Sequence, residues 1–241
     1  MQGSTFQQAQ QGTFAANALP AERLTFLKKT YGLVALALVG FAFLVAILVN
    51  TPTAGYVAQM MTGGYAWLIV LAVFTGVSYL ANSLAYSGSS QAVQFAGLTL
   101  YVVAQAIIFL PLIYIATVLT GDNTLIVKAG ITTGGLVAGL TALVLFTRKD
   151  FSFLGPILTI ASFAALGFIV AGIVFGFSFG TFFAFLMVIF AGGSLLYNTS
   201  NMLHRFRTDQ YVAAALGLFA SIALLFWYIL QIFMGSSSRN D

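Results

Sequence analysis

Long apolar stretches separated by short polar connections recur along the whole chain. A helix needs about 20 apolar residues to cross the hydrocarbon core of a bilayer, and seven stretches approach or exceed that length. All five acidic residues lie outside these stretches. The pattern therefore predicts an all-α integral membrane protein with seven transmembrane helices. Their expected ranges are Tyr31–Asn50, Gly64–Ala85, Ala92–Leu119, Ala129–Thr147, Pro156–Phe177, Thr181–Leu203 and Tyr211–Met234.

The third predicted span is long and is interrupted by Pro111. Proline removes a backbone donor from the interior of a helix and commonly kinks it. Gln105, nearly two turns earlier, offers an amide to a neighbouring helix. Gln105 and Pro111 are therefore a candidate hinge, although a static kink explains the same two residues.

The same pattern divides the chain into a Gln-rich flexible tail over residues 1–22, a membrane domain over residues 23–235 and a short polar tail over residues 236–241. Cytoplasmic loops of membrane proteins carry an excess of Lys and Arg. If the N-terminus is inside, the outer face receives only Lys128 and Arg239. The sequence therefore predicts a cytoplasmic N-terminus and a C-terminus on the opposite side. The cytoplasmic positive residues are then Arg23, Lys28, Lys29, Arg148, Lys149, Arg205 and Arg207.

Composition narrows the function classes further. Only 6% of the residues are charged, whereas soluble domains have about 25%. The chain has no cysteine and one histidine, so we expect no cofactor and no metal site of the usual ligand types. No carboxylate pair or nucleophile–base arrangement is visible at membrane depth, and we expect no enzymatic activity. The net charge of +4 lies at membrane boundaries, which favours contact with the lipid bilayer and not with nucleic acid. The oligomeric state stays open.

The sixth predicted span carries a dense polar patch at membrane depth. Polar groups there need partners inside the helix bundle. Asn198 and Asn201 are three positions apart and therefore share a helix face. The patch is either a hydrogen-bonded hub or ordinary helix–helix contact. Its residues are Tyr197, Asn198, Thr199, Ser200 and Asn201.

His204 ends the same span, beside Arg205. An interfacial position explains this histidine better than pH sensing does, because no acidic residue is spaced to hold its proton. The loop over residues 147–155 includes Arg148, Lys149 and Asp150. Positive charge on the inner side accounts for the two cations, and Asp150 or Ser152 is an expected N-cap of the next helix.

Two segments make the chain resemble the Bax inhibitor-1 family, and within it the bacterial YccA-like branch. Residues 147–155 are similar to the loop between spans four and five, and residues 193–204 are similar to the sixth span. The resemblance implies a non-enzymatic protein of the bacterial inner membrane whose last helix is surrounded by the other six. Some members are described as pH-sensitive calcium leak channels. YccA-like members are associated with the membrane protease FtsH as substrate and modulator.

The chain departs from the channel-type relatives at two positions. Those relatives carry an acidic residue in span six and an aspartate in span seven, a pair that titrates and latches the pore. The matching residues here are Asn198 and Ser221, and neither titrates near neutral pH. Calcium prefers several hard oxygen ligands, usually including carboxylates. We therefore expect a modulator of an FtsH-type protease, with a leak channel for the calcium ion as the alternative.

Overall fold

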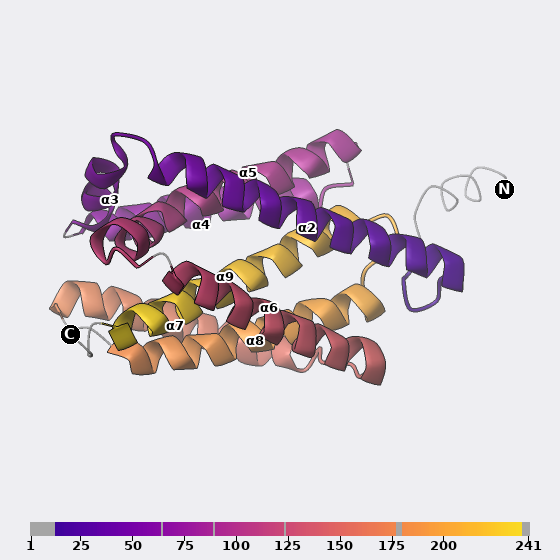
Figure 1. The fold of residues 1–241 in the computed structure, drawn as a ribbon. Helices are drawn as coiled ribbons and strands as arrows, with labels where there is room; N and C mark the ends of the chain where they lie inside the picture. The colour runs from indigo at the N-terminus through magenta and orange to yellow at the C-terminus, as the bar shows by residue number, and fades with distance from the viewer. Residues whose placement is uncertain (1–12, 64, 89, 123, 177–179, 238–241) are drawn as a thin grey trace.

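The computed structural model describes residues 13–63, 65–88, 90–122, 124–176 and 180–237. Within these ranges the chain forms eight α-helices, and seven spans are long and apolar enough to cross a membrane. The predicted all-α membrane fold is therefore confirmed (Figure 1). The elements are α2 (Pro20–Val49), α3 (Ala54–Thr62), α4 (Ala66–Ala85), α5 (Gln91–Tyr114), a π-helical turn η1 (Ile115–Leu119), α6 (Thr124–Thr147), α7 (Leu154–Phe175), α8 (Gly180–His204) and α9 (Tyr211–Ser237).

Helix α9 forms the centre of the bundle, as expected for the last helix. Of its most apolar 18-residue stretch, 72% is buried, whereas the corresponding figure is 11% for α4. It packs against α2, α4, α5, α6 and α8, and Val212, Ala215 and Phe219 are fully buried. A helix that is apolar on every side is stable when neighbours surround it.

Helix α7 is the exception to the expected ring of six helices around α9. It packs mainly against α8, and Gly172 is the one residue that is buried within its described length. The periodicity of a single apolar helix does not reveal which neighbour it contacts, so this difference could not be predicted from the sequence.

The N-terminal segment differs from the predicted tail. Helix α2 begins at Pro20, where the missing N–H of proline suits the first helical turn. Ala15 is fully buried, and its N–H donates to the Phe206 carbonyl at 2.9 Å. The Thr208 N–H donates to the Thr13 carbonyl, also at 2.9 Å. Residues 13–22 therefore belong to the folded bundle; residues 1–12 of the predicted tail lie outside the described residues.

Two further features lie near the end of the bundle opposite the start of α2. Pro111 lies inside α5, and the helix continues past it into the π-helical turn η1. The Thr120 N–H donates to the Ile115 carbonyl at 3.1 Å, as expected for such a widened turn. Helix α3 was not predicted, because its 9 residues are too few to span a membrane. It packs against α5, and its buried residues are Ala54, Ala58 and Met61.

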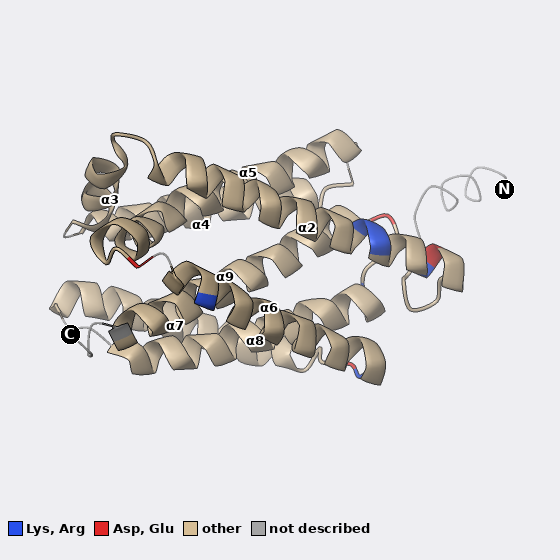
Figure 2. Ribbon diagram, in the orientation of Figure 1, with Lys and Arg blue, Asp and Glu red and all other residues tan. Residues whose placement is uncertain are grey.

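Charged residues gather near the helix ends, and most lie at the end of the bundle where α2 begins (Figure 2). We call this the basic end. It contains the start of α2 and the loops over residues 148–153 and 205–210. Nearby, Lys29 of α2 lies 5.1 Å from the centre of the Tyr211 ring at the start of α9. The one ion pair within the described chain, between Arg207 and Asp209 at 2.9 Å, also lies here.

Candidate functional site

Asn198 and Ser221 come from different helices and meet in space. Asn198 on α8 donates from Nδ2 to the Ser221 hydroxyl on α9 at 2.8 Å and lies 3.2 Å from the Gly217 carbonyl. Ser194, one turn before Asn198, lies 2.9 Å from the Ser221 hydroxyl. Ser221 is buried, and its own hydroxyl is 3.1 Å from the Gly217 carbonyl. We call Ser194, Asn198, Gly217 and Ser221 the α8–α9 polar cluster.

Glycine at position 217 makes this cluster geometrically feasible. A Cβ atom added there would lie 3.2 Å from Asn198 Oδ1 and 3.4 Å from its Cγ. Any side chain would therefore press against the amide and move α8 away from α9. Small residues at such crossings let helices approach closely enough for side-chain hydrogen bonds.

Other members of the predicted patch do not join the cluster. Tyr197 packs its ring against Gly155 of α7, where an added Cβ would lie 3.0 Å from the ring. Thr199 Oγ1 and Asn201 Oδ1 are buried and have no hydrogen-bond partner among the described residues. The residues that form the hydrogen-bonded hub therefore differ from those expected. Ser194 was missed, although its position four residues before Asn198 placed it on the same helix face.

Ser200 connects α8 to the loop that follows α6. Its hydroxyl accepts the Phe151 N–H at 2.8 Å and lies 3.4 Å from Asp150 Oδ1. His204 Nδ1 lies 2.9 Å from the Ser200 carbonyl. An acidic residue thus approaches His204 through Ser200, contrary to the expectation from sequence spacing, because Asp150 belongs to the loop after α6 and His204 to the end of α8.

The loop signature itself has a specific geometry. Arg148 adopts a left-handed backbone conformation with φ 51°, which is uncommon for a residue with a side chain. Arg148, Lys149 and Asp150 are all exposed. Asp150 accepts the Ser152 N–H at 2.8 Å and does not cap α7, whose N-cap residue is Phe153 with no side-chain cap. Hydrogen bonds from Ser152, with smaller contributions from His204 and Arg205, hold the pKa of Asp150 below its usual value.

A cavity of about 810 Å³ lies beside the polar cluster, between α7 and α8. Asn198 and Ser194 line it on one side, and Arg205 lines it toward the basic end. The described lining includes no Asp or Glu. Arg205 is therefore the one charged residue in the described lining, and Asp150 lies near enough to interact with it electrostatically.

The predicted hinge residues lie in the other half of the bundle. Gln105 is 6% exposed, its Oε1 has no hydrogen-bond partner among the described residues, and it lines a second cavity of about 860 Å³. Pro111 is buried in α5. The hinge itself remains a prediction. Within the described chain no group of three His, Cys, Asp or Glu side chains is placed to hold a metal ion.

The sequence matches the family described as inhibitor of apoptosis-promoting Bax1 over residues 23–239. An uncharacterised protein of Pseudomonas aeruginosa is 33% identical over 220 residues, covering 89% of this chain and 90% of that protein. A BI1-like protein of Arabidopsis thaliana is 28% identical, covering 87% and 80% of the two chains. Bax inhibitor 1 of Schizosaccharomyces pombe is 26% identical, covering 95% and 83%. With a folded core of seven spans, the chain belongs to the Bax inhibitor-1 family.

Proposed function

We propose that this protein is a non-enzymatic inner-membrane protein that acts by contact with other membrane proteins, as a modulator of an FtsH-type protease. The observation that carries the proposal is the neutral α8–α9 polar cluster. Asn198 and Ser221 satisfy each other by a 2.8 Å hydrogen bond, so the crossing is held without a group that titrates near neutral pH. A protein with such a crossing is better suited to a fixed scaffold than to a pH-gated pore.

We propose an FtsH-type protease as the partner because residues 147–155 and 193–204 resemble YccA-like proteins. In the proposed orientation the basic end faces the cytoplasm, in accordance with the positive-inside rule. Thr13 pairs with Thr208 in the loop over residues 205–210, so the segment before Thr13 in the sequence joins the bundle at the basic end. Its Gln-rich sequence makes it the candidate handle for a AAA+ protease.

The test uses the full chain with a C-terminal affinity tag in its host membrane. Gentle solubilisation and capture, followed by identification of co-purifying proteins, should recover an FtsH-type protease. Removal of residues 2–12 should lengthen the half-life of the protein. Lys128→Gln, at the far end of the bundle, serves as the control and should change neither result. An unchanged half-life together with no recovered protease would contradict the proposal.

A calcium leak channel is the second candidate, and one observation favours it. The structure brings Asn198 and Ser221 together at the positions where channel-type relatives carry their acidic pair, and the cavities on the two sides of this region share Ser162. Calcium flux in liposomes separates the candidates. We expect no flux for the wild type and a pH-dependent flux for Asn198→Asp with Ser221→Asp. Flux in the wild type would replace the first proposal with the second.

A further inference from the structure

The cavity of about 860 Å³ fills the space where α7 leaves α9. Its walls come from the second halves of α5, α7 and α9 and the first halves of α4 and α8. These parts of the helices lie away from the basic end (Figure 1). The cavity is therefore inside the membrane-spanning part of the bundle, and its size is that of a pocket for a small organic ligand.

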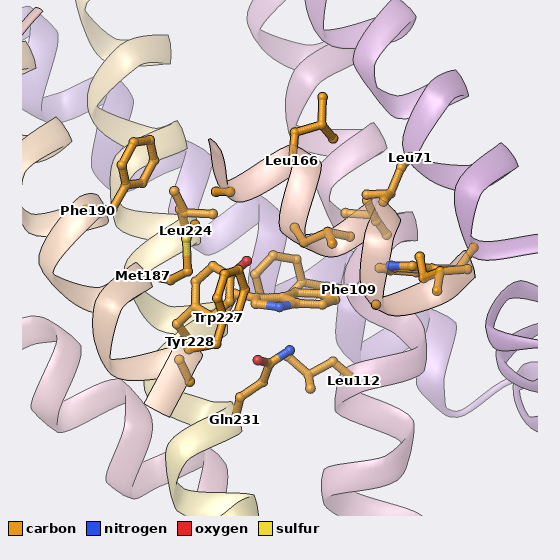
Figure 3. Close-up of a pocket in the computed structure, with 18 of the residues that line it drawn as sticks. Leu71, Phe109, Leu112, Leu166, Met187, Phe190, Leu224, Trp227, Tyr228 and Gln231 are labelled. Atoms are coloured by element: carbon orange, nitrogen blue, oxygen red, sulfur yellow. The ribbon is translucent and has the colours of Figure 1, made fainter. Parts of the chain in front are cut away.

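The described lining of this cavity is mainly apolar and carries no Asp, Glu, Lys or Arg. Phe109 and Trp227 form an edge-to-face pair with ring centroids 4.8 Å apart, and Trp67 stacks on Trp227 at 6.1 Å. Aliphatic side chains such as Leu71 and Met187 complete the walls (Figure 3). Because a charged group would lose its hydration here without gaining a partner, the cavity disfavours ions.

Two amides give the cavity a polar part. Gln231 turns its amide toward the rings of Trp227 and Phe109 (Figure 3). Gln105 lies on the facing helix α5, and its buried Oε1 has no hydrogen-bond partner among the described residues. A buried amide oxygen without a donor is unfavourable in native proteins. Rotation of the terminal amide would turn Oε1 of Gln105 toward a donor held in the cavity. A ligand with an O–H or N–H group would supply that donor.

We propose that this cavity binds a neutral, single-chain amphiphile whose hydroxyl or amide end bonds to Gln105 and Gln231 and whose chain packs against the aromatic and aliphatic walls. The described lining carries no charged residue, so a fatty-acid carboxylate is not the favoured form. A diacyl phospholipid fits less well, because its phosphate would meet no cation among these described residues. This site is independent of the proposed contact with a protease.

The tryptophans of the protein report directly on occupancy. The chain has 2 tryptophans, and both Trp67 and Trp227 line this cavity. The probe is a bromine-labelled monoacylglycerol added to the protein in lipid nanodiscs, since bromine quenches tryptophan fluorescence on contact. We expect quenching that saturates, whereas the same bromine label on a phosphatidylcholine should give only a gradual change with its mole fraction.

Matched variants locate the site. Ala165→Phe on α7 points into the cavity and should abolish the saturable quenching. Ala164→Phe, one residue earlier, is exposed outside the lining and should leave it unchanged. Gln105→Leu preserves the shape and removes the amide, so we expect the apparent Kd to rise about tenfold, the loss of one hydrogen bond. This variant keeps the test decisive if Ala165→Phe fails to fold.

Three results would overturn the proposal. Quenching that never saturates, or that Ala165→Phe leaves intact, means that the probe meets the tryptophans from the bilayer. Equal saturable quenching by the phosphatidylcholine means that an ordinary phospholipid chain fills the cavity. An unchanged Kd in Gln105→Leu means that the amide does not recognise the head group.

Discussion

Helix α9 has two contrasting sides. Toward α8 it carries Gly217 and Ser221, and the two helices come close enough for the 2.8 Å hydrogen bond between Asn198 and Ser221. Further along the helix, Trp227 and Gln231 line a cavity of about 860 Å³ whose opposite walls include α7. Apolar helices in a bilayer gain little from the hydrophobic effect when they associate. Close packing and hydrogen bonds must therefore hold a crossing together, and where large side chains prevent both, a space remains.

Among the variants proposed here, Gly217→Leu should change the free energy of unfolding most. The new side chain would displace Asn198, whose Oδ1 lies 3.2 Å from the position of an added Cβ. We expect a loss of about 1–3 kcal/mol in the free energy of unfolding, as for overpacked sites, measured by unfolding in mixed micelles. Gly139→Leu is the control, because nothing lies within 4 Å of an added Cβ there. Equal losses in both variants would mean that the α8–α9 crossing is not specially close.

Asn198→Leu removes the central amide and keeps the glycine. We expect a loss of about 1 kcal/mol, typical of an interhelical hydrogen bond in a membrane. The loss is limited because Ser194 and Ser221 keep their 2.9 Å contact. Asn82→Leu is the matched control, since that amide bonds only the Ser78 carbonyl of its own helix. A stability equal to that of the control in the same micelles would show that the cluster contributes nothing.

Ala165→Leu tests the cavity, and here we expect the free energy of unfolding to rise and not to fall. A larger apolar side chain on α7 extends into the cavity and gains contacts without a clash. We expect a gain of about 0.5 kcal/mol, at the lower end for cavity filling, measured in the same unfolding experiment. Ala164→Leu, which faces away from the cavity, should show no gain. A loss of stability would indicate that α7 packs closely there in solution.

The smallest expected effect concerns the loop at Asp150. Hydrogen bonds from Ser152 lower the pKa of Asp150 in the folded protein. The resulting stability is present above the unfolded pKa of about 3.9 and is lost as the pH falls through the lower folded value. Asp150→Asn should therefore flatten the decline in stability below about pH 4. An identical decline in the variant and the wild type would mean that this loop opens before Asp150 titrates.

Local patterns predicted the parts of the site that depend on one helix alone. The polar positions of α8 and the proline inside α5 are visible in the sequence, and the resemblance to the family singled out Asn198 and Ser221. The partners are not. Asn198 bonds to Ser221, which is 23 residues away, and Ser200 bonds to Phe151, which is 49 residues away. Which polar groups meet depends on how two helices cross, and hydropathy carries no such information.

The sequence by itself determined the class of the protein, its seven spans and the gathering of positive charge at one end. Each of these follows from the energy of placing one residue type in lipid or water, which is a local quantity. The tertiary structure alone decided that residues 13–15 pair with residues 206–208, that α9 packs closely on α8, and that α7 stands apart from α9 across a cavity. These outcomes depend on side-chain shape at contacts between distant segments, and packing in a bilayer is decided by such shape.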